Sequence, residues 1–290
     1  MRKRRIDIAV ISDVHLGNPA CRADELLAYL NSIRPKKLIL NGDIIDFHNL
    51  GNDYFPPAHM KVLKKIVGMA SGQTEVIYIT GNHDELLRRV RELSIGNICL
   101  MNKLALKLDG KNAWFFHGDA LDISFQFASW IGKLGSVGYE TLIWINGFRN
   151  TILKRLGYEK YSLAERIKNE TDGAERFIQN FEKTATSIAI ENGYDYVVCG
   201  HIHKPKKEIC ESRRGICMYL NSGDWVENLT ALEYSFKRWK IYHYHYDKLS
   251  AFFADDTLKD MDINELMSSI IDLKAGKKHI ERKYGESIND

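Results

Sequence analysis

Short apolar runs that stop at polar clusters recur along the first third of the chain. Residues 6–11, 37–40 and 76–79 are rich in isoleucine, leucine and valine, and their length and composition predict buried strands. Between them, residues 24–33 and 58–69 carry apolar side chains at the spacing of an amphipathic helix. This alternation predicts repeated β-loop-α units and therefore a layered α/β fold.

The pattern changes in the second half of the chain. Residues 104–108 and 114–116 predict two more strands, joined by a turn at Asp109-Gly110. From 120 to about 192 the apolar spacing is helical, which predicts a helical insertion. Strands are predicted again at 196–199, 218–220, 230–236 and 241–246. The last two should form a hairpin that turns at Lys237-Arg238.

These elements predict one catalytic-size domain over residues 1–246, with the insertion inside it. Beyond that point the chain is rich in Lys, Asp and Glu and carries only short helical patches. We therefore predict that residues 247–290 form a charged, partly ordered C-terminal tail.

Composition narrows the functions that this fold can serve. A net charge of +3 is too small to favour nucleic-acid binding, which usually needs a strongly basic face. No apolar run approaches the roughly 18–20 residues that span a bilayer, so we expect a protein that is soluble or at most attached to a membrane surface. Five cysteines without paired spacing favour reduced thiols and a cytoplasmic location. The oligomeric state has no signal in the sequence.

Polar clusters fall at the ends of five predicted strands. They are Asp13-Val14-His15, Gly42-Asp43 with Asp46, Gly81-Asn82-His83-Asp84, His117-Gly118-Asp119 and Gly200-His201-Ile202-His203. Ligands of α/β sheets gather at the carboxyl ends of strands, so these clusters should converge. In the first and last clusters, a spacing of two puts both side chains on one face of an extended segment.

The residue types in these clusters are those of metal ligands. Carboxylates, an amide and imidazoles without thiolate suit divalent cations such as Mn²⁺, Fe or Zn²⁺, and two ions account for the number of ligands better than one. Each cluster alone has a plainer interpretation as a capped loop or a polar pair. All five in this order favour a metal centre. His243 and His245, by contrast, alternate on a predicted strand, where a solvated sheet face is favoured over a metal site.

In this combination of motifs the chain resembles the calcineurin-like metallophosphoesterases, whose pattern is D-x-H, G-D-x-x-D, G-N-H-[DE], a later histidine and G-H-x-H. The resemblance covers roughly residues 6–236. It implies a four-layer α-β-β-α sandwich and hydrolysis of phosphate esters or phosphoanhydrides with two metal ions, most suitably Mn²⁺. It implies one set of ligands made of Asp13, His15, Asp43 and His203, and a second made of Asp43, Asn82, His117 and His201. Asp43 would be the bridge, since a carboxylate can bind two cations.

Other side chains beside the predicted ligands have roles of their own. His83 is not needed for coordination, so we predict that it donates a proton to the leaving group or stabilises the phosphoryl charge. Asp84 either orients the His83 ring or caps the helix that follows, and both interpretations stay open. Asp46 and Asp119 are predicted to fix loops around the site.

Within the superfamily, the chain is most similar to the UDP-2,3-diacylglucosamine pyrophosphatases of lipid A synthesis. The similarity rests on the insertion between the His117 and His201 motifs, the spacing of the ligands and the segment Asn221-Ser-Gly-Asp-Trp225. It implies hydrolysis of UDP-2,3-diacylglucosamine to the lipid monophosphate and UMP. One position departs, because the proteobacterial enzymes carry Arg where this chain has His83. A phosphodiesterase acting on a soluble nucleotide or another small phosphodiester is therefore the alternative.

The insertion carries features that suit an amphipathic substrate. The apolar residues that could line a groove are Ile131, Leu134, Leu142, Ile143, Trp144 and Phe148. Residues 149–168 hold six Lys/Arg against two Glu, a net charge of +4. This charge would suit a diphosphate or the anionic inner face of a membrane. We predict Arg166 and Lys168, together with Asn82, as substrate contacts. The plainer interpretation is that the apolar residues hold the helices together and the charges form their solvated face.

Overall fold

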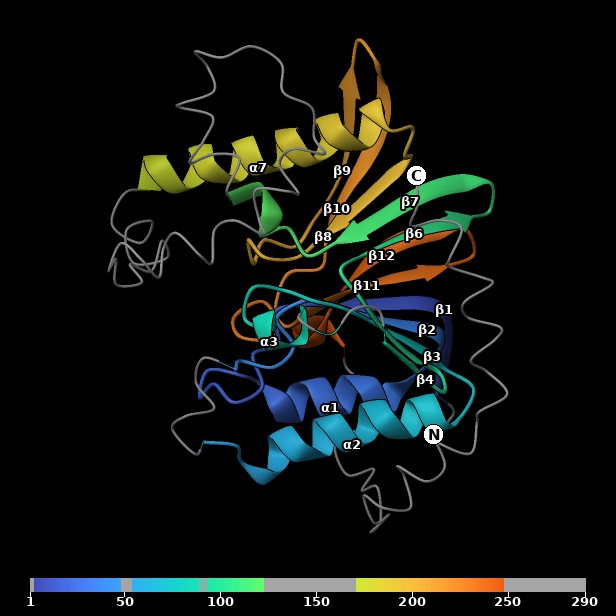
Figure 1. Cartoon of the computed structure of the whole chain (residues 1–290), viewed down its shortest axis with the longest axis vertical. Helices are drawn as coiled ribbons and strands as arrows, with labels where there is room; N and C mark the ends of the chain where they lie inside the picture. Colours follow the sequence, from blue (N-terminus) through green and yellow to red (C-terminus); the bar gives the residue numbers. More distant parts are fainter. Residues whose placement is uncertain (1–2, 48–53, 89, 91–92, 123–170, 248–290) are drawn as a thin grey trace.

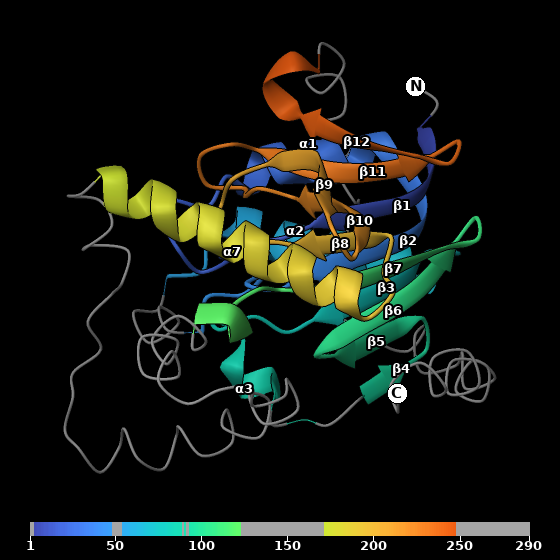
Figure 2. The same ribbon diagram turned by 90° about the horizontal axis from the view of Figure 1, so that it is seen from above.

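Two β-sheets lie face to face between helices in the computed structural model of the chain (Figure 1). α1 (Ala23–Ser32) and α2 (Pro57–Ser71) cover the outer face of the larger sheet. α7 (Thr171–Glu191) lies across the outer face of the smaller sheet, as Figure 2 shows. The structure describes residues 3–47, 54–88, 90, 93–122 and 171–247. The predicted four-layer α-β-β-α sandwich is confirmed.

The larger sheet has seven strands. In order across the sheet they are β12 (Arg238–His243), β11 (Thr230–Ser235), β1 (Arg4–Ile11), β2 (Ile33–Asn41), β3 (Glu75–Ile79), β5 (Ile98–Met101) and β4 (Leu93–Ile95). β1, β2, β3 and β5 run parallel, whereas β4, β11 and β12 pair with their neighbours in antiparallel fashion. The carboxyl ends of the four parallel strands therefore meet at one edge.

The smaller sheet has five strands. In order across the sheet they are β6 (Lys103–Leu108), β7 (Lys111–Phe116), β8 (Tyr196–Cys199), β10 (Gly215–Asn221) and β9 (Lys206–Ser212). β7, β8 and β10 are parallel in the centre, and the two outer strands are antiparallel to them. The short helix α3 (Glu85–Arg88) follows β3, at the end of the molecule where the central strands of both sheets finish (Figure 1).

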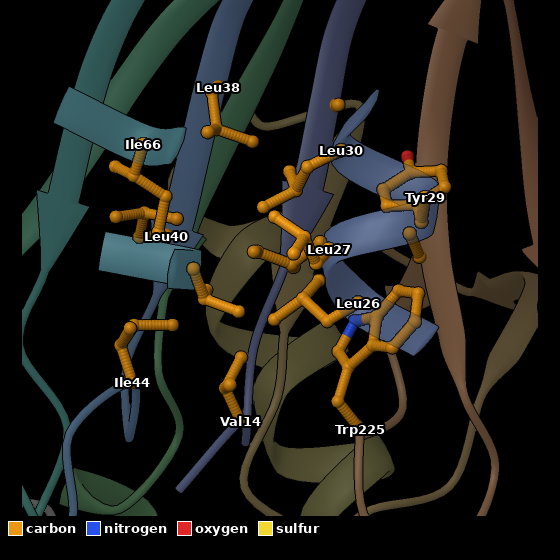
Figure 3. Packing of buried hydrophobic residues seen from close by; sticks show 14 of the residues in the cluster. Val14, Leu26, Leu27, Tyr29, Leu30, Leu38, Leu40, Ile44, Ile66 and Trp225 are labelled. Atoms are coloured by element: carbon orange, nitrogen blue, oxygen red, sulfur yellow. The ribbon is translucent and has the colours of Figure 1, made fainter. Parts of the chain in front are cut away.

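Apolar side chains fill the space between the layers. Leu26 and Leu30 of α1 belong to the same cluster of buried side chains as Leu38 of β2, and Figure 3 shows Leu26 beside Trp225. A second cluster, around Phe115, lies between the two sheets, and a third, around Phe181, lies beneath α7. Burying one such side chain contributes about 1.5–3 kcal/mol, so the layers hold the strand ends in fixed positions.

Two predictions for the last hairpin are wrong. The strand predicted to reach residue 246 ends at His243, and Tyr244–Tyr246 form the 3-10 helix η2, so His243 and His245 do not share a strand face. The turn lies at Phe236-Lys237, one residue earlier than predicted, with φ of 52° and 59°. Such turns usually take Gly or Asn at these positions, so Phe and Lys carry no turn signal.

The sequence pattern also misses β4, β5 and β9. Four of the seven residues of β9 are charged, and its side chains are exposed or half-buried at the sheet edge, so it lacks the apolar pattern of a central strand. Most of the predicted insertion and the tail after 247 lie outside the described residues, and the domain boundaries stay predictions. Among the described helices, none is long and apolar enough to cross a bilayer.

Candidate metal centre

Loops from both sheets converge at the edge where the parallel strands end. Three groups of side chains have ligand atoms that lie within 4.8 Å of one another. They are Asp13, His15 and His203; His15, Asp43 and His83; and Asp43, His117 and His201. The predicted clusters therefore come together, and the groups overlap at His15 and Asp43.

Backbone strain is concentrated at this site. Five of its residues have φ between 51° and 67°, in the left-handed region that residues other than glycine seldom adopt. They are Asp13, His15, Asp43, His201 and His203. Hydrogen bonds hold two of these loops together, because the N–H groups of Val14 and His15 both donate to the carbonyl of Asp43, at 2.9 and 3.0 Å. The strained loops turn side chains from different strands toward one centre.

Two glycines leave room that the site residues fill. A Cβ atom at Gly81 would lie 2.1 Å from Asp43 Oδ1, and one at Gly200 would lie 2.5 Å from Asp13 Oδ2. These are far inside van der Waals contact. Gly81 of the G-N-H motif and Gly200 of the G-H-x-H motif are therefore required, because a larger residue at either position would collide with the carboxylate beside it.

Two buried polar atoms fit a metal ion. His117 donates from Nδ1 to the carbonyl of Asn41 at 2.9 Å, and its Nε2 is buried and makes no hydrogen bond. Asn82 Oδ1 is likewise buried without a hydrogen-bond partner. Leaving a buried polar atom unpaired costs about 1–3 kcal/mol, and a divalent cation with nitrogen and oxygen ligands would remove that cost. The residues present therefore fit the cations that the motifs imply.

The two buried aspartates are held in their ionised form. Burial raises the pKa of Asp13, but His203, whose Nε2 lies 3.2 Å from Asp13 Oδ1, outweighs burial and brings the pKa to about 2. In the same way His117, with Nε2 3.3 Å from Asp43 Oδ2, holds the pKa of Asp43 well below its usual value. Both carboxylates thus carry negative charge in the metal-free protein.

Two histidines carry positive charge opposite these aspartates, because their pKa values are raised. Burial lowers the pKa of His203, but Asp13 reverses the effect and raises it to about 9. His117 likewise has its pKa raised well above the usual value by Asp43, despite full burial. The metal-free centre therefore balances two aspartates with protonated imidazoles. A bound cation would take over that balancing role.

His83 lies beside this centre with a carboxylate partner. Its Nδ1 donates to Asp46 Oδ1 at 3.1 Å, and its backbone N–H donates to Asp43 Oδ1 at 2.8 Å. Its ring meets that of His15 edge-on, with centroids 4.7 Å apart. Burial lowers the pKa of His83, but the hydrogen bond to Asp46 and the negative charges of Asp43 and Asp46 together outweigh burial, so the net shift is upward. Asp46 also accepts a hydrogen bond from Asn18 Nδ2 at 3.1 Å, which fixes the carboxylate.

Asp84 follows His83 in the chain, but the hydrogen bonds of its carboxylate go to other residues. Its carboxylate accepts hydrogen bonds from the hydroxyl of Tyr78 at 2.7 Å and from the N–H groups of Ile45 and Gly81, both at 3.2 Å. These contacts join the loop after β2 to the loop after β3. Among the described residues, the carboxylate that orients the His83 ring is that of Asp46, which corrects the partnership predicted for Asp84.

Further side chains brace the surrounding loops. Asp119 pairs with Arg88 at 2.7 Å, in agreement with the loop-fixing role predicted for it. The buried Asp224 accepts N–H groups of its own loop, and Asn228 Nδ2 donates to the carbonyl of His203 at 2.9 Å. The sequence pattern does not single out Asn228, because Asn228 lies outside the motifs and contacts one of them only through the backbone of His203.

Asp122 is a second residue that the sequence pattern misses. Its Oδ2 lies 2.6 Å from His201 Nε2. Its place just after the His117 motif, at a spacing of five residues, is the one signal that could have pointed to it. Arg166 and Lys168 lie outside the described residues, so their predicted contacts stay predictions.

Comparisons with known proteins identify relatives by sequence and a similar solved structure. The UDP-2,3-diacylglucosamine hydrolase of Blochmanniella pennsylvanica (strain BPEN) is 27% identical over 241 residues, covering 76% of this chain and 88% of the relative. The protein of the same name from Aliivibrio fischeri (strain MJ11) is 25% identical over 253 residues, covering 82% and 97%. A dimetal phosphatase from Danio rerio aligns with a TM-score of 0.41 at 13% identity, over 81% of this chain and 95% of that one.

Residues 6–205 match the family described as calcineurin-like phosphoesterase, a span that contains all five ligand motifs. The family implies divalent metal ions, and the three overlapping groups of ligand atoms are placed to receive them. By its sequence and the chemistry of its strand ends, the chain belongs to the calcineurin-like phosphoesterase family and is a metal-dependent phosphoester hydrolase.

Proposed function

We propose that the chain hydrolyses a phosphoanhydride or phosphodiester with two divalent cations bound at this centre. One cation would be held by Asp13, His15, Asp43 and His203, and the other by Asp43, Asn82, His117 and His201. The observation that carries the proposal is the overlap of the ligand groups, because Asp43 belongs to two of the three. A carboxylate has two oxygens and can serve two cations at once. Mn²⁺ suits this ligand set best, and Fe and Zn²⁺ are the other candidates.

The reaction divides into what the cations supply and what the chain supplies. When bound, two divalent cations would lower the pKa of the attacking water and stabilise the charge on the phosphoryl oxygens. The chain contributes His83, whose Nδ1 donates to Asp46 and whose Nε2 lies 4.0 Å from Asp43 Oδ2, so that the ring lies inside the site. The raised pKa keeps a proton available on this ring for the leaving group or for a hydrogen bond to the phosphoryl oxygen.

For the substrate we propose UDP-2,3-diacylglucosamine, cleaved to the lipid monophosphate and UMP in lipid A synthesis. The two curated relatives that bear this name support the choice, since each aligns over most of its own length. Arg166 and Lys168 would bind the diphosphate. The reaction would take place in the cytoplasm, with peripheral contact at the inner face of the membrane, where such a lipid resides. His83, which replaces the arginine of the proteobacterial enzymes, favours a soluble nucleotide or small phosphodiester as the second candidate.

A substrate panel tests the choice. Mn²⁺-loaded protein should hydrolyse UDP-2,3-diacylglucosamine more efficiently than soluble UDP-sugars or an aryl phosphodiester. Each CH₂ that leaves an apolar groove costs about 0.8 kcal/mol, roughly a fourfold rise in KM, so shorter acyl chains should bind progressively worse. Indifference to acyl length would favour the soluble substrate. No Mn²⁺-dependent turnover of any member would overturn the proposed reaction.

The basic residues of the insertion give a second test. Reversing the charge of Arg166 and Lys168 should raise KM for the diacyl substrate while turnover of the aryl phosphodiester stays near normal, because the small ester needs only the metal centre. Equal loss on both substrates would mean that the substitutions damage the fold or the metal centre.

A further inference from the structure

One histidine of the centre depends on a carboxylate that belongs to no family motif. Asp122 Oδ2 lies 2.6 Å from His201 Nε2, and the side chains are 27% and 15% exposed, so water competes little with the contact. The backbone N–H of His201 donates to the Asp13 carboxylate, at 3.0 Å to Oδ2, which fixes the backbone and leaves the ring to be fixed by Asp122. Asp122 is the last described residue of the segment that begins at His117, and it lies in the helical turn of residues 120–122.

The hydrogen bond decides which ring nitrogen is free. A carboxylate only accepts, so Nε2 of His201 carries the proton and Nδ1 is left with the lone pair. His117 shows the reverse arrangement, with Nδ1 donating to the carbonyl of Asn41 and Nε2 facing Asp43 Oδ2 at 3.3 Å. Both rings belong to the group that contains Asp43. Each histidine is thus held through one nitrogen while the other is available to the centre.

We propose that Asp122 is a positioning residue for His201: it fixes the tautomer and orientation in which the ring presents Nδ1 to the metal centre. The proposal rests on the proposed two-cation function. The partner of the His201 ring is an anionic carboxylate, whereas the partner of the His117 ring is a neutral carbonyl. The hydrogen-bond partners of the two rings also differ in how they can be tested. The partner of His117 is the backbone carbonyl of Asn41, which no substitution removes, whereas the side chain of Asp122 can be replaced.

The test measures metal binding directly. Asp122→Ala and Asp122→Asn are compared with Asp7→Asn, which removes one carboxylate from a surface pair with Lys36. Binding of Co²⁺ is followed by calorimetry and by its visible spectrum, and the unfolding temperature of each metal-free variant is recorded. Loss of an outer partner of a metal-ligating histidine typically weakens metal affinity by about 10- to 100-fold.

We expect Asp122→Ala to lower the affinity for one of the two Co²⁺ ions by about 10- to 100-fold and to change the visible spectrum of the bound Co²⁺. The unfolding temperature of the metal-free protein should change little. Asp122→Asn should fall between, because its amide oxygen still accepts the Nε2 proton but carries no charge. Asp7→Asn should match the unmodified chain. Binding of both ions by Asp122→Ala at full affinity would overturn the positioning role alone. Failure of the unmodified chain to bind two ions would overturn the proposed function itself. If Asp122→Ala unfolds, the affinity of Asp122→Asn decides.

Discussion

Charged side chains are arranged differently at the two ends of the larger sheet. Toward the beginning of its parallel strands, opposite charges pair within the chain, as in Arg4 with Glu233 at 2.9 Å and Lys37 with Glu75. At the end where these strands finish, Asp13 and Asp43 are almost fully buried, at 0% and 2% exposure, and each raises the energy of the other's charge.

The difference separates stability from function. Arg4 and Lys37 balance the carboxylates beside them without a ligand. Asp13 and Asp43 repel each other on strained, left-handed backbone, and among the described residues only imidazoles balance their charges in the empty site. A cation bound there removes part of that repulsion, and its binding energy then adds to the stability of the folded state. Substitutions at the two ends should therefore have opposite consequences, which can be tested in order of expected effect.

The largest effect is expected at Asp43. Asp43→Ala removes the one carboxylate shared by two ligand groups, so metal and activity should disappear together, with kcat lower by more than roughly 10³-fold. The metal-free variant should unfold within about 4 °C of the metal-free parent, the change expected for about 1 kcal/mol in a domain of this size. Metal analysis and thermal denaturation in chelator check both. Two tightly held ions per variant chain would contradict the bridging assignment.

Next in size is His83. His83→Ala should retain both metal ions and lower kcat by roughly 10²- to 10⁴-fold, since the ring works on the leaving group or the phosphoryl charge. Asp46→Asn should lower kcat by less, because the amide oxygen can still accept the Nδ1 proton. The metal content and kcat of the two variants are measured side by side. Unchanged turnover of the natural substrate by His83→Ala would remove the catalytic role.

Two glycine-to-alanine substitutions compare the metal centre with a position away from it. Gly81→Ala places a methyl group 2.1 Å from Asp43 Oδ1 and should displace that carboxylate, with a loss in kcat/KM of about 10²-fold, the effect of a misplacement of about 1 Å. Gly193→Ala, before β8 at the opposite end, meets no atom within 4 Å but has φ of +73°. It should cost about 1–2 kcal/mol of stability and no activity. Activity assays and denaturant unfolding of both variants test the contrast, and a Gly81→Ala enzyme with normal kcat/KM would defeat it.

Much of this site could be predicted from the sequence because each ligand follows directly after a buried strand. The apolar run marks where the strand ends, and the parallel topology brings such ends together. The ligand clusters therefore emerge from local pattern alone. The alternating apolar runs and amphipathic helices likewise predict a layered α/β domain, whereas the four-layer arrangement is what the resemblance to the calcineurin-like metallophosphoesterases implies.

The partners of the ligands could not be predicted in this way. Asp84 adjoins His83 in sequence, yet Asp46, 37 residues away, contacts its ring. Asp122 and His201 are 79 residues apart and meet only when the two loops pack together. Such pairs depend on tertiary contacts that no periodicity encodes.

The smallest effect on activity is expected from the charge pair at the other end of the sheet. Glu233 is buried, and its Oε2 accepts from Arg4 Nη1, whose guanidinium also lies 5.2 Å from the centre of the Tyr242 ring. Glu233→Ala leaves the half-buried guanidinium without this acceptor and should cost about 1–3 kcal/mol, or about 2–4 °C in unfolding temperature for each kcal/mol.

Glu233→Gln keeps an oxygen acceptor and the side-chain volume, so it should lose less stability than the alanine variant. Both variants should keep the metal content and kcat of the parent, because the two charges pair with each other and none of the three ligand groups includes them. Thermal unfolding measured with and without metal separates the two ends: the shift should be the same in both conditions for Glu233, and should appear only with metal for Asp43. A loss of metal affinity in Glu233→Gln would mean that the charges at the two ends are coupled through β1, and that the division between stability and function does not hold.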